Sequence, residues 1–98
     1  MELSVKQRQY LKGLAHDLNP VVMIGDKGLT DAVIKEVITS LNAHEIIKIR
    51  VLGDDRKLRT SMIDDLCQKT NASLVQHIGK LLVLYRGNEA AKIVLPKG

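Results

Sequence analysis

The sequence predicts one α+β domain in which helices cover a small mixed sheet. Its 98 residues are enough for a single domain of modest stability. Segments with helical periodicity alternate with short apolar runs, in the order helix, strand, helix, strand, helix, strand, strand. Strand–helix–strand units favour parallel neighbours, whereas the short Gly79-Lys80 connection requires an antiparallel final pair. The sheet should therefore contain strands of both kinds.

The first helix is expected from Leu3 to Leu18. Ser4 can cap its N-terminus, and Gln7 completes a capping box. The pair Asn19-Pro20 ends it, because a residue before proline avoids the α region. One face of this helix is apolar and should point inward; it holds Tyr10, Leu11, Leu14, Ala15 and Leu18. The opposite face is basic and has no acid of its own; it holds Lys6, Arg8, Gln9, Lys12 and His16.

The next segment combines a strand, a glycine turn and a helix. Val21–Ile24 is apolar throughout, which is typical of a strand buried on both faces. The turn Gly25-Asp26-Lys27-Gly28 follows at once. Thr30 is the expected N-cap of a helix that runs to about His44. The apolar stripe of this helix holds Val33, Ile34, Val37, Ile38 and Leu41.

The second half of the chain supplies the other strands and one more helix. Glu45–Leu52 alternates between apolar and polar residues, as in a strand with at least one buried face. The turn at 53–55 can cap a helix from about Arg56 to Thr70. Ser73–Ile78 and Leu81–Arg86 form the predicted hairpin. Lys92–Leu95 is expected to add a short edge strand.

Composition narrows the classes of function. The formal charge of +4 is compatible with a polyanionic partner without demanding one. Tyr10 and Tyr85 are too few aromatics for a module that stacks successive bases on rings. Cys67 is the only cysteine, so an internal disulfide is impossible and a cysteine metal site is not expected. With no signal peptide and no apolar run near the length of a membrane span, we expect a cytoplasmic protein without cofactor or metal.

No group of residues has the spacing of a catalytic site. His16, His44 and His77 are each isolated in the sequence. The pair Asp54-Asp55 is better explained as a helix cap, and Asp64-Asp65 as part of a solvated helix face. We therefore expect that the protein is not an enzyme.

The glycine turn is the main candidate for a binding site. A strand that feeds a tight turn at a helix N-terminus leaves backbone N–H groups pointing one way, which suits a phosphate oxygen. KH domains clamp the nucleic-acid backbone with such a GxxG loop, although their loop joins two helices. The alternative is a plain connector in which both glycines adopt positive φ. Lys27 and the basic helix face favour the phosphate site, whereas Asp26 opposes it.

Several segments, in order and spacing, resemble the YhbY family of single bacterial CRM (chloroplast RNA splicing and ribosome maturation) domains. They are LSVKQRQYLKGLAHDLNPVVMIGDKGLT at 3–30, HEIIKIRV at 44–51, IGKLLVLYR at 78–86 and KIVLP at 92–96. The resemblance makes residues 1–98 one CRM domain. It implies a two-layer fold with a four-stranded mixed sheet, like the C-terminal domain of bacterial translation initiation factor three. It also implies RNA binding and association with precursors of the large ribosomal subunit.

The resemblance and the charge pattern together define the expected site and partner. The backbone amides of residues 26–30 would hold a phosphate. The expected partner is 23S ribosomal RNA in pre-50S particles, bound by a monomer, with no DNA or membrane partner. Two alternatives stay open: a protein-binding adaptor on the ribosome that uses the sheet edge near Lys92–Leu95, and a small enzyme that holds a phosphorylated metabolite. The expected RNA-binding residues are Gly25, Asp26, Lys27, Gly28, Thr30, Lys6, Lys12, His16, Lys80 and Arg86.

Overall fold

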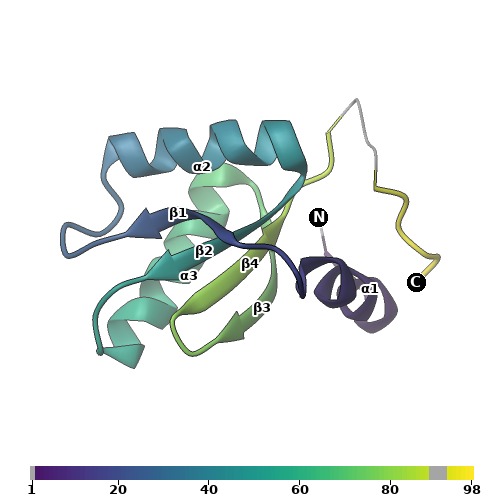
Figure 1. The fold of residues 1–98 in the computed structure, drawn as a ribbon, viewed down its shortest axis with the longest axis horizontal. Coiled ribbons are helices and arrows are strands. Elements are labelled where there is room, and N and C mark those ends of the chain that lie inside the picture. The colour runs from purple at the N-terminus through teal and green to yellow at the C-terminus, as the bar shows by residue number, and fades with distance from the viewer. Residues whose placement is uncertain (1, 89–92) are drawn as a thin grey trace.

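The computed structural model describes residues 2–88 and 93–98. Within them it contains one sheet with the strand order β1-β2-β4-β3, in which β1 is parallel to β2 and the other pairs are antiparallel. The predicted α+β class with a mixed sheet and the predicted order of elements are confirmed (Figure 1). The elements are α1 (Val5–Ala15), β1 (Pro20–Ile24), α2 (Asp31–His44), β2 (Ile46–Val51), α3 (Arg56–Thr70), β3 (Ser73–Ile78) and β4 (Leu81–Tyr85).

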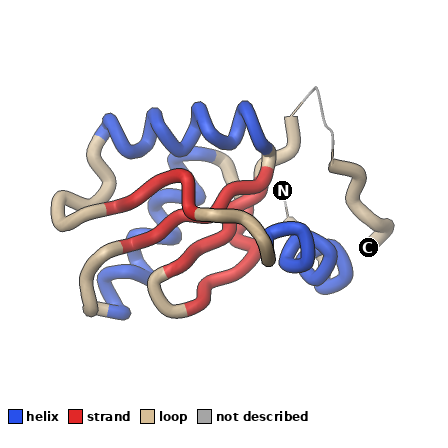
Figure 2. The backbone as a smooth tube through the Cα atoms, viewed as in Figure 1, coloured by secondary structure: helices blue, strands red, loops and turns tan. Residues whose placement is uncertain are grey.

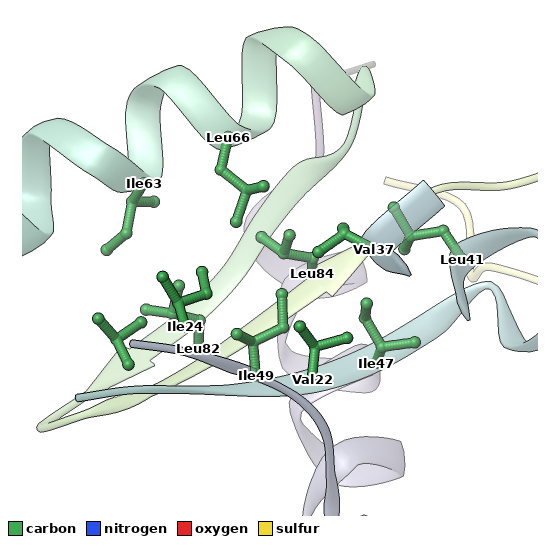
Figure 3. Close-up of a cluster of buried hydrophobic side chains, with 11 residues drawn as sticks. Val22, Ile24, Val37, Leu41, Ile47, Ile49, Ile63, Leu66, Leu82 and Leu84 are labelled. Carbon is green, nitrogen blue, oxygen red and sulfur yellow. The ribbon is translucent and has the colours of Figure 1, made fainter. Parts of the chain in front are cut away.

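The main core lies between the sheet and the helices α2 and α3 (Figure 3). Alternate residues of the strands point into it, because successive side chains of a strand face opposite ways. Truncating one of these fully buried aliphatic side chains to alanine would cost about 2–5 kcal/mol. The buried side chains are Val22, Ile24, Ile47, Ile49, Val51, Leu82 and Leu84 of the sheet, with Val37, Leu41, Ile63 and Leu66 of the helices.

Helix α1 packs against the other face of the sheet, at one end only. Leu11 and Ala15 are buried there beside Ile46, Val83 and Tyr85. The helix begins with the predicted capping box, in which the Ser4 hydroxyl accepts from the Gln7 N–H. Figure 1 places the loop between β1 and α2 at the left and α1 toward the right, so much of this sheet face is left without a covering helix.

The predicted inward face of α1 was partly wrong. Tyr10, Leu14 and Leu18 are 44%, 41% and 36% exposed. The helix is rotated so that Arg8 and Lys12 are half-buried along the sheet, and Arg8 Nε donates to the Leu74 carbonyl at 3.4 Å. Long aliphatic stems of basic residues can cover apolar surface while the charged ends reach solvent. The helix also ends at Ala15 rather than Leu18, because the chain turns with a bond from the Leu18 N–H to the Ala15 carbonyl.

Two predictions about strands were also wrong. β1 is buried on one face only, with Val21 47% and Met23 58% exposed, because it lies at an edge of the sheet where α1 does not cover it. Residues 93–95 form no strand, and Lys92 lies outside the described residues. Ile93 and Leu95 instead pack on the core beneath α1, and the Ile93 N–H donates to the Glu45 carboxylate at 3.2 Å.

Candidate nucleic-acid interface

The loop between β1 and α2 is a tight turn that opens directly into a helix, as predicted. The Gly28 N–H donates to the Gly25 carbonyl at 3.0 Å, and the Thr30 N–H donates to the Gly28 carbonyl at 3.1 Å. Thr30 is the N-cap of α2, and its hydroxyl accepts from the Val33 N–H at 3.2 Å. These bonds fix the loop at the N-terminus of a 14-residue helix.

The two glycines of the loop have different structural roles. Gly28 has φ of 68°, a conformation that L side chains rarely adopt. Gly25 does not have positive φ, and a Cβ placed on it would meet no heavy atom within 4 Å. The connector interpretation, with both glycines at positive φ, therefore explains Gly28 alone. Folding does not require glycine at Gly25, which is consistent with close approach of a ligand to the backbone there.

The loop offers fewer backbone donors than the sequence predicts. Among residues 26–30, the N–H groups of Gly28 and Thr30 are used inside the loop. In the part of the chain that the structure describes, the N–H groups of Asp26, Lys27 and Leu29 donate to no protein acceptor. The first N–H groups of α2 also lack acceptors within the helix, as at any helix start. A phosphate would therefore meet these donors rather than all five predicted amides.

Charges at the loop do not by themselves attract an anion. Asp26 and Asp31 are exposed and flank the single cation Lys27. A helix N-terminus is equivalent to roughly half a positive charge, which does not offset the second carboxylate. Asp26 lies on the side of α3, where it lines a cavity of about 450 Å³ together with Asp54, Asp55 and Asp65. Attraction for a polyanion must come from elsewhere on the surface.

A basic groove between α1 and the sheet supplies that attraction. It has a volume of about 600 Å³ and is lined by Lys12 of α1, by His16 and Asp17 just after that helix, and by Lys48 of β2. Arg50 follows two residues after Lys48 on the same face of β2 and is exposed. Lys48 and Arg50 were not predicted as site residues. The signal was present in the alternation of HEIIKIRV, which gives both side chains one face.

The other predicted site residues are spread over the molecule. Lys6 is exposed on α1 and does not itself line the groove. Lys80 lies at the loop end of the sheet, where its carbonyl accepts from the Val51 N–H, and its Nζ lies 2.9 Å from Asp54. The hydrogen bond from Lys80 lowers the pKa of the Asp54 carboxyl. His16 contacts Asp17 at 3.2 Å, which offsets any charge that it carries.

Arg86 lies at the opposite end of the sheet from the loop. Its Nη1 donates to the Thr70 carbonyl at 2.7 Å, and its Nη2 contacts the Asn42 side chain. Its guanidinium therefore joins the ends of α3 and α2. The structure does not bring Arg86 together with Gly25–Thr30 or with the basic groove.

The described residues show no assembled chemical centre. They contain no group of three or more His, Cys, Asp or Glu residues that could hold a metal ion. Burial raises the pKa of the Cys67 thiol, which disfavours the reactive thiolate. None of the described helices is both long enough and apolar enough to cross a membrane.

Comparisons with known proteins agree on one family. Residues 3–86 match the model of the CRS1/YhbY (CRM) domain. The chain is 54% identical over 95 residues to a Haemophilus influenzae protein named as an RNA-binding protein, with 97% of this chain and 96% of that protein covered. It is 35% identical over 95 residues to a probable RNA-binding protein of Bacillus subtilis, with 96% and 99% covered. The solution structure of a Staphylococcus aureus protein described as a candidate RNA binder superposes with a TM-score of 0.84 at 35% identity, over 97% of this chain and 100% of that one.

Proposed function

Because the chain belongs to the CRS1/YhbY (CRM) domain family, we propose that it is a non-enzymatic RNA-binding protein. The finer proposal is that it docks on structured 23S ribosomal RNA in pre-50S particles in the cytoplasm and assists their assembly. The observation that carries it is that one molecule has both a Gly25–Gly28 loop with free backbone N–H groups and a groove lined by Lys12 and Lys48. Relatives over nearly the full length are named as RNA-binding proteins, which supports the same class.

The proposed mechanism divides attraction from positioning. Lys12, Lys48 and Arg50 supply long-range attraction for phosphates, with Lys27 adding charge at the loop. The free N–H groups of Asp26, Lys27 and Leu29 then fix one phosphate in place, because contacts to phosphates set register and orientation. Gly25 leaves room for that phosphate to approach the backbone. Such binding reads shape and backbone more than sequence.

The single-residue test of this proposal is Lys27→Ala. Lys27 is exposed and has no protein partner in the described structure, so the melting temperature should stay unchanged. RNA affinity should fall by about threefold to tenfold, the effect of losing roughly one phosphate contact at low salt. Titration of labelled ribosomal RNA fragments measures the affinity, and thermal unfolding measures the melting temperature. Unchanged RNA affinity would make the loop a connector only.

The biological target needs a second experiment. Crosslinking in cells, followed by sequencing of the attached RNA, should recover 23S segments from large-subunit precursors. Association with those particles on a gradient should be lost after Gly28→Asp, which adds bulk and charge at the helix start. A contact made through protein should survive nuclease digestion of the extract, and that outcome would favour the adaptor alternative. The edge strand that the adaptor would have used is not formed at residues 93–95.

A further inference from the structure

One row of side chains crosses all four strands on the sheet face that carries α1. Met23 of β1 pairs with Arg50 of β2, Arg50 pairs with Leu81 of β4, and Leu81 pairs with Ile78 of β3. Met23 and Ile78 are 58% and 59% exposed, and Leu81 is half-buried. We call this row, together with Lys48 and Gln76 beside it, the open sheet face.

The open sheet face is uncovered because of where the helices lie. Helices α2 and α3 pack on the opposite face, and α1 packs beside Ile46, Val83 and Tyr85 at the far end. In Figure 2 the strands lie in front of α3, while α1 lies beside them at the end away from the β1–α2 loop. Exposed apolar side chains in such a row mark an interaction surface rather than scattered surface residues.

Charge decides which partner the open sheet face fits. Arg50 lies within the row, and Lys48 and Lys12 line the groove that adjoins it. Asp17 is the one acid among the described residues that line this groove, and it contacts His16. An apolar row beside three cations and a single carboxylate suits a partner that joins flat apolar rings to negative charge. Unpaired nucleotides have that chemistry.

The open sheet face lies close to the loop. The Leu52 N–H donates to the Ile24 carbonyl, so the loop begins where β1 and β2 end. Along a strand the rise is about 3.3 Å per residue, which places Gly25 about 7 Å beyond Met23 and roughly 13 Å beyond the level of Lys48. A few linked nucleotides can cross that span. A phosphate at the loop and bases on the open sheet face are therefore compatible with one RNA strand.

We propose that the open sheet face binds unpaired RNA bases next to the backbone held by the loop. The bases lie on the apolar surface of Met23, Leu81 and Ile78, and the Arg50 guanidinium stacks on one of them. Lys48 and Lys12 hold the adjoining phosphates. This inference rests on the proposed function and deepens it, because it gives the preferred RNA as a helix with a single-stranded extension.

The test compares two RNA probes, a blunt hairpin and the same hairpin with a short single-stranded extension. Wild-type protein should bind the extended hairpin more tightly. The double variant Met23→Ser, Ile78→Ser should bind the extended hairpin about tenfold more weakly and the blunt hairpin within about twofold of wild type. Leu58→Ser is the matched control, because Leu58 is 68% exposed on α3 and lies outside the open sheet face. All three variant positions are exposed, and unfolding curves verify that each protein is folded.

Arg50→Lys separates stacking from charge. It keeps the positive charge and removes the planar guanidinium, so the ratio of its affinities for the extended and the blunt hairpin should fall toward one. Equal binding of both hairpins by wild type would overturn this inference and leave the proposed function standing. Failure of wild type to bind either hairpin or ribosomal RNA fragments would overturn the proposed function itself. A nuclease-resistant contact that the double variant abolishes would assign the face to a protein and overturn the inference.

Discussion

At the scale of single residues, Gly25 and Gly28 allow folding and binding to be tested separately. Gly28 has φ of 68°, so Gly28→Ala should lower the free energy of unfolding by about 1–2 kcal/mol. Gly25 needs no special φ and has free space around it, so Gly25→Ala should raise the free energy of unfolding by about 0.4–1 kcal/mol. The added methyl group should nevertheless weaken RNA binding, because it lies where a phosphate would approach. Urea unfolding and RNA titration of both variants measure these effects.

The pattern expected at Gly25 is unusual, because one substitution should improve stability and impair binding. A Gly25→Ala protein that is more stable and binds RNA like wild type would show that no ligand approaches this backbone. A Gly25→Ala protein that is less stable would show that the turn itself requires glycine there. The first result would exclude a phosphate at Gly25, and the second would exclude free space for a side chain there.

For single residues, the sequence predicts hydrogen bonds between near neighbours in the chain and misses partners that are distant in the chain. The Ser4 capping box and the Thr30 N-cap were predicted, because both depend on residues three positions apart. The partners of Lys80 and Arg86 were not, because Asp54 and Thr70 are distant in sequence. Both side chains were predicted as RNA ligands from the family resemblance and their charge, and neither shows which protein groups a side chain already contacts.

At the scale of elements, Arg86 is expected to stabilise the fold rather than to bind RNA. Its guanidinium donates to the Thr70 carbonyl at the end of α3 and contacts Asn42 of α2, while its backbone N–H donates to the Glu45 carbonyl at 2.8 Å. Arg86→Ala leaves the Thr70 carbonyl without this charged donor, so the free energy of unfolding should fall by about 1–3 kcal/mol. RNA affinity, measured where the variant is fully folded, should stay within about twofold of wild type.

Arg50→Ala should have the opposite effect to Arg86→Ala, although both variants remove an arginine. Arg50 is exposed on β2, so its removal should change stability little and weaken RNA binding clearly. Chemical denaturation and RNA titration of the two variants should therefore give reciprocal results. If Arg86→Ala weakens RNA binding more than Arg50→Ala while remaining as stable as wild type, Arg86 belongs to the interface.

Element order was predictable, whereas the exposure of each element was not. Hydrophobic periods of helices and strands are local, so all seven elements were found in the right order. The rotation of α1 could not be predicted from its helical wheel, because Arg8 and Lys12 contribute aliphatic surface that the pattern counts as polar. The exposure of Met23 depends on β1 being an edge strand, which only the assembled sheet order determines.

At the scale of the whole molecule, charge is distributed unevenly between the two sides of the loop. The cavity beside α3 is lined by four carboxylates and two cations, so acids are in excess there: Asp26, Asp54, Asp55 and Asp65, with Arg59 and Lys69. Lys12 and Lys48 line the groove on the α1 side. The net charge of +4 gives no sign of this uneven distribution, because it sums over both sides. An approaching RNA should therefore favour the open sheet face over the cavity beside α3.

Salt dependence tests that arrangement on the intact protein. If Lys12, Lys27, Lys48 and Arg50 each neutralise one phosphate, the plot of log affinity against log salt should have a slope of about −3 to −4. Lys48→Gln should reduce the magnitude of that slope by about 1, because one fewer counterion is released. Lys57→Gln is the matched control, since Lys57 is exposed on α3 and lines neither the groove nor the open sheet face. Titrations of an RNA hairpin at several salt concentrations give the slopes. A reduction by Lys57→Gln without a reduction by Lys48→Gln would place the RNA over α3 instead of over the open sheet face, because the slope counts only the phosphates that the lysines contact.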